Sequence, residues 1–130
     1  MRFRDIVYAY LKSCTDITAL VNEKVYPANK IPQEVKAPYV VSQQSGRQRG
    51  YTHQGYDGTD TYTFTISALA KTDDECGLIA DAILEVIEAW PGENINIGYS
   101  QLVNETDATW EVNLEVYSID LTFEIFYQQN

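Results

Sequence analysis

Few side chains in this 130-residue chain belong to the types that catalyse reactions or bind metals. His53 is the single histidine, and the two cysteines, Cys14 and Cys76, fall on the apolar faces of predicted helices. A metal site needs several converging ligands, and an activated nucleophile needs a base within hydrogen-bonding reach. The sequence contains no Cys-x-x-Cys, His-x-x-x-His or His-Glu-x-x-His spacing. We therefore expect no catalytic residue, no metal and no cofactor.

Carboxylate pairs and phosphate-binding loops are the remaining chemistries to consider. Glu85 and Glu88 have the side-chain type of a glycosidase couple, but their spacing indicates the solvated face of a helix. The glycines at 46, 50, 55 and 58 match neither the P-loop nor the dinucleotide-binding spacing. Neither feature predicts an enzyme.

The segment from Gly46 to Gly58 is the best candidate for binding. It carries Arg47, Arg49, Tyr51, His53 and Tyr56. Arginine and tyrosine are enriched at binding hot spots, and the glycines predict a loop that orders when it meets a partner. Two alternatives stay open. Stacking and phosphate contacts would suit RNA, although two arginines in an acidic chain favour it little, and the segment could be a plain flexible hairpin tip.

Charge is divided along the chain. The net charge is −10, yet all nine Lys and Arg residues lie at or before Lys71, where six acidic residues leave +3. From Thr72 onwards there are thirteen acidic residues and no base, which gives −13. Such asymmetry favours head-to-tail contact between the basic part of one copy and the acidic part of another. The alternative is that the acidic half only maintains solubility.

Helical periodicity marks the start of the chain. Apolar residues recur at helical spacing from Phe3 to Cys14. A second short helix is predicted over Ile17 to Val21, with Thr15 or Asp16 as its N-cap. Asn22 suits the left-handed residue that ends such a helix.

Strand signals follow. Val25 to Pro27 reads as a brief strand at a sheet edge, because proline cannot donate to a ladder. Pro38 to Gln44 and Thr59 to Ala70 are predicted to pair as a hairpin around the glycine-rich segment. The second of these alternates apolar residues with threonines, so one face meets the core and the other meets solvent or a partner. Ile95 to Val103 is a further strand, and Tyr117 to Tyr127 shows the strongest alternation.

One long helix lies between these strands. Thr72 followed by Glu75 is a capping box, and the pair Pro91-Gly92 ends the helix. One side carries the apolar stripe. The other side carries Asp74, Asp81, Glu85 and Glu88.

These elements predict an α+β fold. We expect a mostly antiparallel sheet of four to five strands, with an N-terminal helix and one long helix packed on it, and a long β-hairpin loop at 46–58. At this length one domain over residues 1–130 is expected, with enough burial for a core. Two cysteines are too few for a disulfide framework, so we expect buried thiols and a reducing cytoplasm. No apolar stretch is long enough to span a bilayer.

Several short patterns occur in a fixed order. They are Asp16 to Val21, Lys24 to Pro27 (Lys-Val-Tyr-Pro), Pro38 to Val41 (Pro-Tyr-Val-Val), Tyr62 to Ala70 and Tyr117 to Tyr127. In this order they resemble the small tail completion (tail terminator) proteins of long-tailed bacteriophages. The resemblance covers nearly the whole chain, and the glycine-rich segment is its main departure.

The resemblance implies a structural role. Members form a homo-oligomeric ring, usually a hexamer, on the head-proximal end of the tail tube; the ring ends tube polymerisation and provides the head-attachment surface. The implied partners are other copies, the tail tube protein and a head–tail connector or stopper, with no membrane. The implied location is the virion tail, after assembly in the bacterial host cytoplasm. Phage DNA passes through without specific binding, and the base-free second half of the chain is a candidate lining.

The residues expected to contact partners or neighbouring subunits are Arg47, Arg49, Tyr51, His53, Tyr56, Asp81, Glu85 and Glu88. Two alternatives to a tail terminator remain open. One is another neck protein, either a head–tail connector or a stopper. The other, from a different class, is a small α+β ligand-binding or enzymatic domain, which would need a concave site with converging polar groups.

Overall fold

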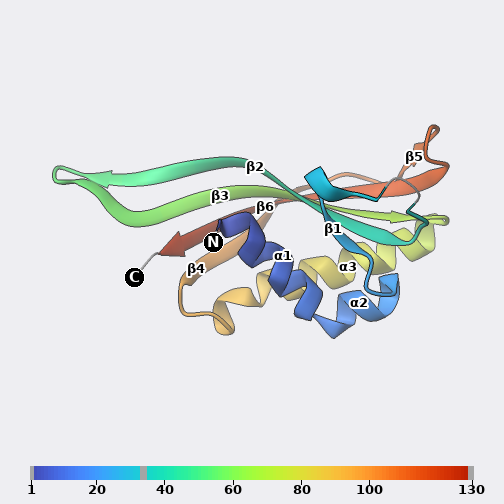
Figure 1. Cartoon of the computed structure of the whole chain (residues 1–130), viewed down its shortest axis with the longest axis horizontal. Coiled ribbons are helices and arrows are strands. Elements are labelled where there is room, and N and C mark those ends of the chain that lie inside the picture. Colours follow the sequence, from blue (N-terminus) through green and yellow to red (C-terminus); the bar gives the residue numbers. More distant parts are fainter. Residues whose placement is uncertain (1, 33–34, 129–130) are drawn as a thin grey trace.

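The structure is a computed structural model that describes residues 2–32 and 35–128, without the side chains of Thr52, Tyr56 and Asp57. It consists of a long twisted sheet with all three α-helices on one face (Figure 1). The helices are α1 (Phe3–Ser13), α2 (Thr15–Val21) and α3 (Asp73–Glu88), with 3-10 turns η1 (Ala28–Lys30) and η2 (Trp90–Gly92). The strands are β1 (Val25–Pro27), β2 (Tyr39–Thr52), β3 (Gly55–Ala70), β4 (Ile97–Glu105), β5 (Thr109–Glu111) and β6 (Val116–Gln128).

The sheet is mixed but mostly antiparallel. Its order is β1-β2-β3-β6-β4, and β5 pairs with the start of β6 on the side away from β3. The short edge strand β1 runs parallel to β2, and every other pairing is antiparallel. The predicted α+β class is confirmed. The sheet gains a sixth strand from β5, which has three residues and is too short for alternation to reveal.

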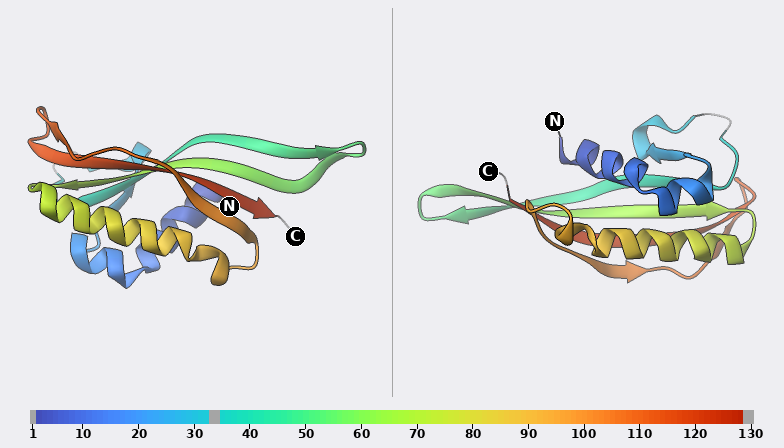
Figure 2. Two further views of the ribbon diagram at one scale, coloured as in Figure 1. Left: turned by 180° about the vertical axis from the view of Figure 1, so that it is seen from behind. Right: turned by 90° about the horizontal axis from the view of Figure 1, so that it is seen from below.

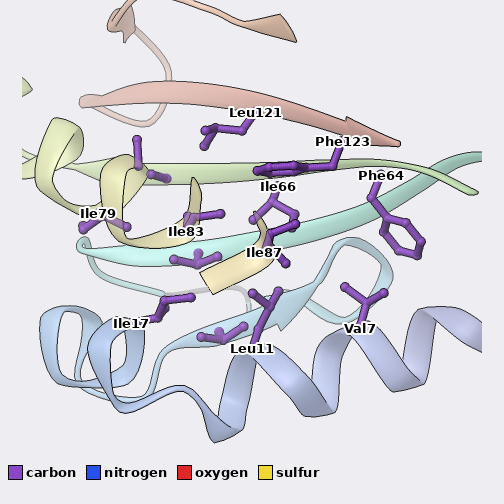
Figure 3. Close-up of a cluster of buried hydrophobic side chains, with 14 of the residues drawn as sticks. Val7, Leu11, Ile17, Phe64, Ile66, Ile79, Ile83, Ile87, Leu121 and Phe123 are labelled. Atoms are coloured by element: carbon purple, nitrogen blue, oxygen red, sulfur yellow. The ribbon is translucent and has the colours of Figure 1, made fainter. Parts of the chain in front are cut away.

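Alternation along the two central strands builds the core. Phe64 of β3 lies opposite Phe123 of β6, and both point towards the helices. Val7 and Leu11 of α1 and Ile83 of α3 are fully buried against this face (Figure 3). Burying one such side chain contributes about 1.5–3 kcal/mol. Packing therefore holds both helices to one face and leaves the opposite face open.

Local capping chemistry sets two of the helix boundaries. The Thr72 hydroxyl accepts a hydrogen bond from the backbone N–H of Glu75 at 3.2 Å, as predicted for α3. Asn22 ends α2 in the left-handed region with φ 55°, also as predicted. The N-cap of α2 was predicted wrongly, because Cys14 takes the extended cap conformation and makes no side-chain cap bond. Thr15 and Asp16 already belong to the first turn.

An aromatic cluster fixes α1 across the sheet. The Phe3 ring stacks on Tyr62 with centroids 4.2 Å apart and lies 4.7 Å from Tyr127. Tyr10 stacks on Trp90 at 4.5 Å, and its hydroxyl donates to the Val86 carbonyl at 2.6 Å. Burial raises the Tyr10 pKa well above its usual value, with the neighbouring Cys14 and Glu93 adding to it. Such rings bury large areas and favour offset or edge contacts.

The glycine-rich segment is paired strand and not a loop. β2 and β3 continue through it and leave a two-residue turn at His53 and Gln54. Gly55, with φ 108°, closes that turn in a conformation that other residues rarely adopt. Glycine weakens strands, and the β2–β3 ladder is irregular next to two of these glycines. The irregularities lie between Gln44 and Gly46 and again next to Gly50. The expectation of a loop, which rested on the glycine content, was therefore wrong.

Gly98 in β4 is required by a close approach. A Cβ atom at this position would lie 2.5 Å from Cδ1 of Phe126, whose ring stacks on Tyr99 at 5.4 Å. We expect Gly98→Ala to displace the ring and lower the free energy of unfolding by about 1–2 kcal/mol. Urea denaturation checks this. Gly77→Ala is the matched control, because nothing lies within 4 Å of that site in α3. It should stabilise by about 0.5–1 kcal/mol, and equal effects of the two variants would contradict the prediction.

Candidate functional site

The paired segment of residues 46–58, called the arm here, projects beyond the rest of the molecule. β6 pairs with β3 only as far as Thr59, so the arm beyond this point consists of β2 and β3 alone. It extends past the helical layer at one end of the long axis (Figure 2). A two-stranded projection of this kind has little stability of its own, which makes it a candidate contact element.

An ion pair anchors the base of the arm. Arg47 Nε lies 3.2 Å from Oδ1 of Asp60, and Nη2 lies 3.0 Å from Oδ2. The Asp60 side chain has 0% exposure, whereas that of Arg47 has 38%. The guanidinium also lies 5.5 Å from the centroid of the Tyr62 ring. A bidentate pair fixes geometry as well as charge, so Arg47 serves to position the arm.

The other predicted contact residues of the arm have separate placements. Arg47, Arg49 and Tyr51 share one side of β2 according to the strand register. Tyr51 is 66% exposed, and His53 is exposed in the turn. The side chain of Tyr56 lies outside the described part of the structure. Tyr51 and His53 are therefore the most accessible described members of this set.

The second predicted set lies on α3. Asp81, Glu85 and Glu88 are all exposed, as is Asp74, on the side of the helix that faces away from the sheet. α3 lies under the sheet, whereas the arm extends beyond it (Figure 1). Within one subunit the structure does not bring these two sets together. Contact between them would require two copies.

Charge segregation along the chain becomes segregation across the molecule. The residues up to Lys71, with a charge of +3, build α1, α2 and strands β1 to β3. The residues from Thr72 onwards, with −13, build α3 and strands β4 to β6. Because the sheet order is β1-β2-β3-β6-β4, the basic and acidic parts form its two opposite lateral sides.

Both lateral sides end in strand edges. β1 covers β2 only at Val40 to Ser42, and the sheet order has no other strand beyond β2 in the described part of the chain. β4 is the terminal strand on the opposite side. Terminal edges present backbone N–H and C=O groups that can pair with another chain. These edges are the natural places for contact between copies.

Large apolar side chains are exposed at several places, among them Leu20, Ile31, Leu78 and Ile95. Five more lie on or next to β4 and β5 on the acidic side, and sequence patterns did not reveal them. They are Tyr99 (37% exposed), Val103 (58%), Trp110 (46%), Val112 (75%) and Leu114 (58%). Residues 110–115 alternate apolar with polar or acidic types, which was the available signal. Apolar residues gathered on one side indicate an interaction surface, and several belong to the edge formed by β4 and β5.

The sheet face away from the helices, called the open face here, is polar. Its centre is formed by Gln43, Thr63, Thr65, Ser67, Gln101, Asp120, Thr122 and Glu124. Ser67 Oγ donates to Asp120 at 2.7 Å, and the Tyr99 hydroxyl donates to Glu124 at 2.7 Å. That bond to Glu124 is the main reason why the Tyr99 pKa is raised. None of the described strand residues that face this side is Lys or Arg.

Reactive chemistry is limited. Burial raises the pKa of the Cys76 thiol to about 11, and burial also raises the pKa of Cys14. A thiol is a poor nucleophile when so little thiolate is present. Cys76 is buried as expected, but Cys14 is only half-buried. Among residues 2–32 and 35–128, no three His, Cys, Asp or Glu side chains are grouped so that they could hold a metal ion.

A surface hollow lies between α1, η1 and β2. It is lined by Arg4, Asp5, Tyr8, Tyr26, Lys30 and Ser42, among others. Neither cysteine nor His53 lines it.

None of the described helices is both long and apolar enough to cross a bilayer.

Comparison with known proteins indicates the family of this chain. A chain from the "Virion of native gene transfer agent (GTA) particle" shares the fold, with a TM-score of 0.70 and 17% identity over 94% of this chain and 91% of that chain. The family described as "Tail completion protein gp17" matches residues 6–128, and the chain belongs to this family. No curated protein matches the sequence.

Membership of this family defines the broad role. The protein is a tail completion protein, a structural component of a phage-like virion. The family is structural and not enzymatic, which confirms the expectation of no catalysis and excludes the enzymatic alternative.

Proposed function

We propose that this protein closes the head-proximal end of the tail tube as a homo-oligomeric ring. The ring ends tube polymerisation and offers its other surface to the head–tail connector or stopper. One observation carries the proposal: the two lateral sides of the subunit have opposite charge, and each ends in a strand edge. This arrangement suits a structural tail protein that assembles with copies of itself.

The symmetry of a ring explains why opposite sides matter. In a cyclic assembly every interface is heterologous, so one patch meets a different patch on the next copy. The basic side of one subunit then faces the acidic side of its neighbour. Exposed ion pairs contribute only about 0.2–1 kcal/mol each, so they select orientation. Burial of the exposed apolar residues Val103 and Trp110 supplies affinity.

The arm and the acidic stripe of α3 take different roles in this proposal. Tyr51 and His53, near the tip of the arm, contact the neighbouring subunit or the tube. Arg47 holds the arm in position through Asp60. Glu85 and Glu88 add to the negative side that selects the orientation of the neighbour.

Tube capping can be tested directly. Tail tube protein is polymerised in vitro with and without this protein, and tube lengths and ends are measured by negative-stain electron microscopy. We expect a ring on one tube end and growth arrested at that end. A connector or stopper would leave bare tubes to grow, and unchanged tube growth would contradict the proposal. Virions with normally ended tails after deletion of the gene would contradict it as well.

A further inference from the structure

We infer that neighbouring copies join by antiparallel pairing of β4 in one copy with the outer edge of β2 in the next. The outer edge of β2 is defined here as residues 43–49, directly beyond the stretch covered by β1. This inference rests on the proposed ring and specifies its interface. It makes one continuous sheet run through successive subunits.

Strand register places the start of β4 level with the far end of this edge. Ile97 of β4 pairs with Tyr127 of β6. Tyr127 pairs with Asp60 of β3, and Asp60 pairs with Arg49 of β2. Ile97 and Arg49 therefore lie at the same height along the strands, on opposite sides of the sheet.

The end of β4 is level with the point where β1 stops. Glu105 pairs with Leu121, which pairs with Ile66 of β3. Ile66 in turn pairs with Ser42, the last residue of β2 that β1 covers. β4 therefore spans the height of β2 that no other strand of the described sheet covers.

Cyclic symmetry brings the two edges together at this common height. Rotation about a ring axis involves no translation along that axis. With the strands close to parallel to the axis, β4 of one copy meets residues 43–49 of the next at the same height. The direction fits too. β4 runs antiparallel to β6, β6 to β3 and β3 to β2, so β4 and the neighbour's β2 meet antiparallel.

The two strands differ in charge. β2 contains Arg47 and Arg49 and no acidic residue, whereas β4 contains Glu105 and no base. The edge of β4 also exposes Val103, which is 58% accessible. Long edges with exposed apolar residues are templates for strand addition, and monomeric proteins usually block them. In the level register Glu105 lies opposite Ser42 and not opposite the arginines, so the edges form no close ion pair. The difference in charge acts only against a second β4 edge as the partner, because two β4 edges would carry like charge.

Paired cysteines test the register. Asn104 pairs with Thr122, Thr122 with Thr65, and Thr65 with Gln43, so Asn104 and Gln43 lie level on the open face. Opposed residues in an antiparallel pair come within disulfide distance. Under mild oxidation, the double variant Gln43→Cys with Asn104→Cys should give a covalent ladder up to the full ring. Each single variant, which retains the native thiols, should stay without a ladder.

A displaced pair serves as the matched control. Gln48→Cys with Asn104→Cys places the thiols about 13 Å apart along the strands in the level register, because Gln48 pairs with Thr61 and Gln43 with Thr65. No ladder is therefore expected. A ladder from this pair alone would mean that the same edges pair with a tilted, slid register, which still supports the inference. Ladders from neither pair would overturn it. A ladder from the single Asn104→Cys variant would indicate β4 pairing with β4 and would also overturn it.

A blocking substitution provides an independent measurement. Val103→Lys replaces the exposed apolar side chain of the β4 edge by a lysine, the residue with which edge strands block pairing, at the height of Gln43 and Gln44 of the neighbour. It should weaken assembly at least tenfold by mass photometry. Leu20→Lys, at an exposed site of α2 away from both strand edges, should assemble like the parent chain. Circular dichroism checks whether both variants fold. Normal assembly of Val103→Lys would overturn the edge pairing.

The two proposals fail in different ways. Tube capping by rings that give no ladder would leave the proposed function standing and overturn the edge pairing. Ladders in a protein that leaves tube growth unchanged would support the edge pairing and contradict the capping role.

Discussion

Replacing Arg47 by methionine is expected to lower the free energy of unfolding by about 3 kcal/mol and to loosen the arm. The Asp60 carboxylate has 0% exposure, and this change removes its bidentate guanidinium partner. Removing one member of a buried ion pair typically costs about 3–5 kcal/mol, because the remaining charge stays desolvated. The low end applies here, since the Arg47 side chain is 38% exposed and the pair is partly screened.

Two measurements separate anchoring from general stability. Urea unfolding followed by fluorescence gives the free energy, and hydrogen exchange of residues 46–58 reports on the arm. Arg4→Met, at an exposed position of α1, is the control and should change stability by less than about 0.5 kcal/mol. Adding Asp60→Asn to Arg47→Met should recover part of the loss, because no charge is then buried. A loss for Arg47→Met no larger than for Arg4→Met would show that the pair is not an anchor.

Much of the fold was accessible from local patterns. The threonine alternation before Ala70 correctly predicted one buried and one open face, because side-chain direction in a strand repeats every two residues. The capping residue Thr72 and the left-handed Asn22 were also predicted, since each depends only on its immediate neighbours. Sequence patterns are therefore reliable where the structure they predict depends only on neighbouring residues of the same helix or strand.

The arm shows where local reading fails. Its glycines suggested a loop, yet the strands pair through the whole segment and end in a two-residue turn. The Arg47–Asp60 pair depends on a register that one irregularity resets near Ser45 and another resets near Gly50. Irregularities of this kind arise from the balance of pairing, twist and packing over two strands. No pattern within either strand alone specifies them.

The sequence revealed only part of the candidate surfaces. The division of charge at Lys71 could be counted directly. That the two halves become two lateral sides depends on β6 inserting between β3 and β4, which is a long-range pairing. The exposed residues Trp110 and Val112 lie in and just beyond β5, which has only three residues, so alternation alone could not show which side of the sheet they would join.

The structure also refines which surface suits the passage of DNA. Sequence alone suggested the base-free second half, but that half contributes to both faces of the sheet. The helix side carries bases from α1 and the arm, including Arg4 and Arg49, beside the acidic α3. The described strand residues of the open face include Asp120 and Glu124 and no base. Cationic surfaces hold DNA by releasing counterions from phosphates, so the open face is the better candidate for a lumen.

Reversing charge on the open face should therefore slow DNA ejection. We expect particles with Asp120→Lys and Glu124→Lys to eject DNA several-fold more slowly than the parent, because each lysine gains a phosphate contact. The measurement is dye-reported ejection from particles of normal appearance, repeated at higher salt, where the difference should shrink. Asp120→Asn with Glu124→Gln removes the same charges without adding a base and should eject at the parental rate.

A second reversal decides between the two sides of the subunit. Glu85→Lys with Glu88→Lys adds the same number of bases to the exposed side of α3. If the open face lines the channel, these particles eject normally once assembled, although the changed charge of α3 lowers the yield of rings. Slow ejection from this variant, with normal ejection after reversal at Asp120 and Glu124, would instead place the helical side in the lumen. Salt dependence confined to one of the two variants would then identify the surface that the DNA meets.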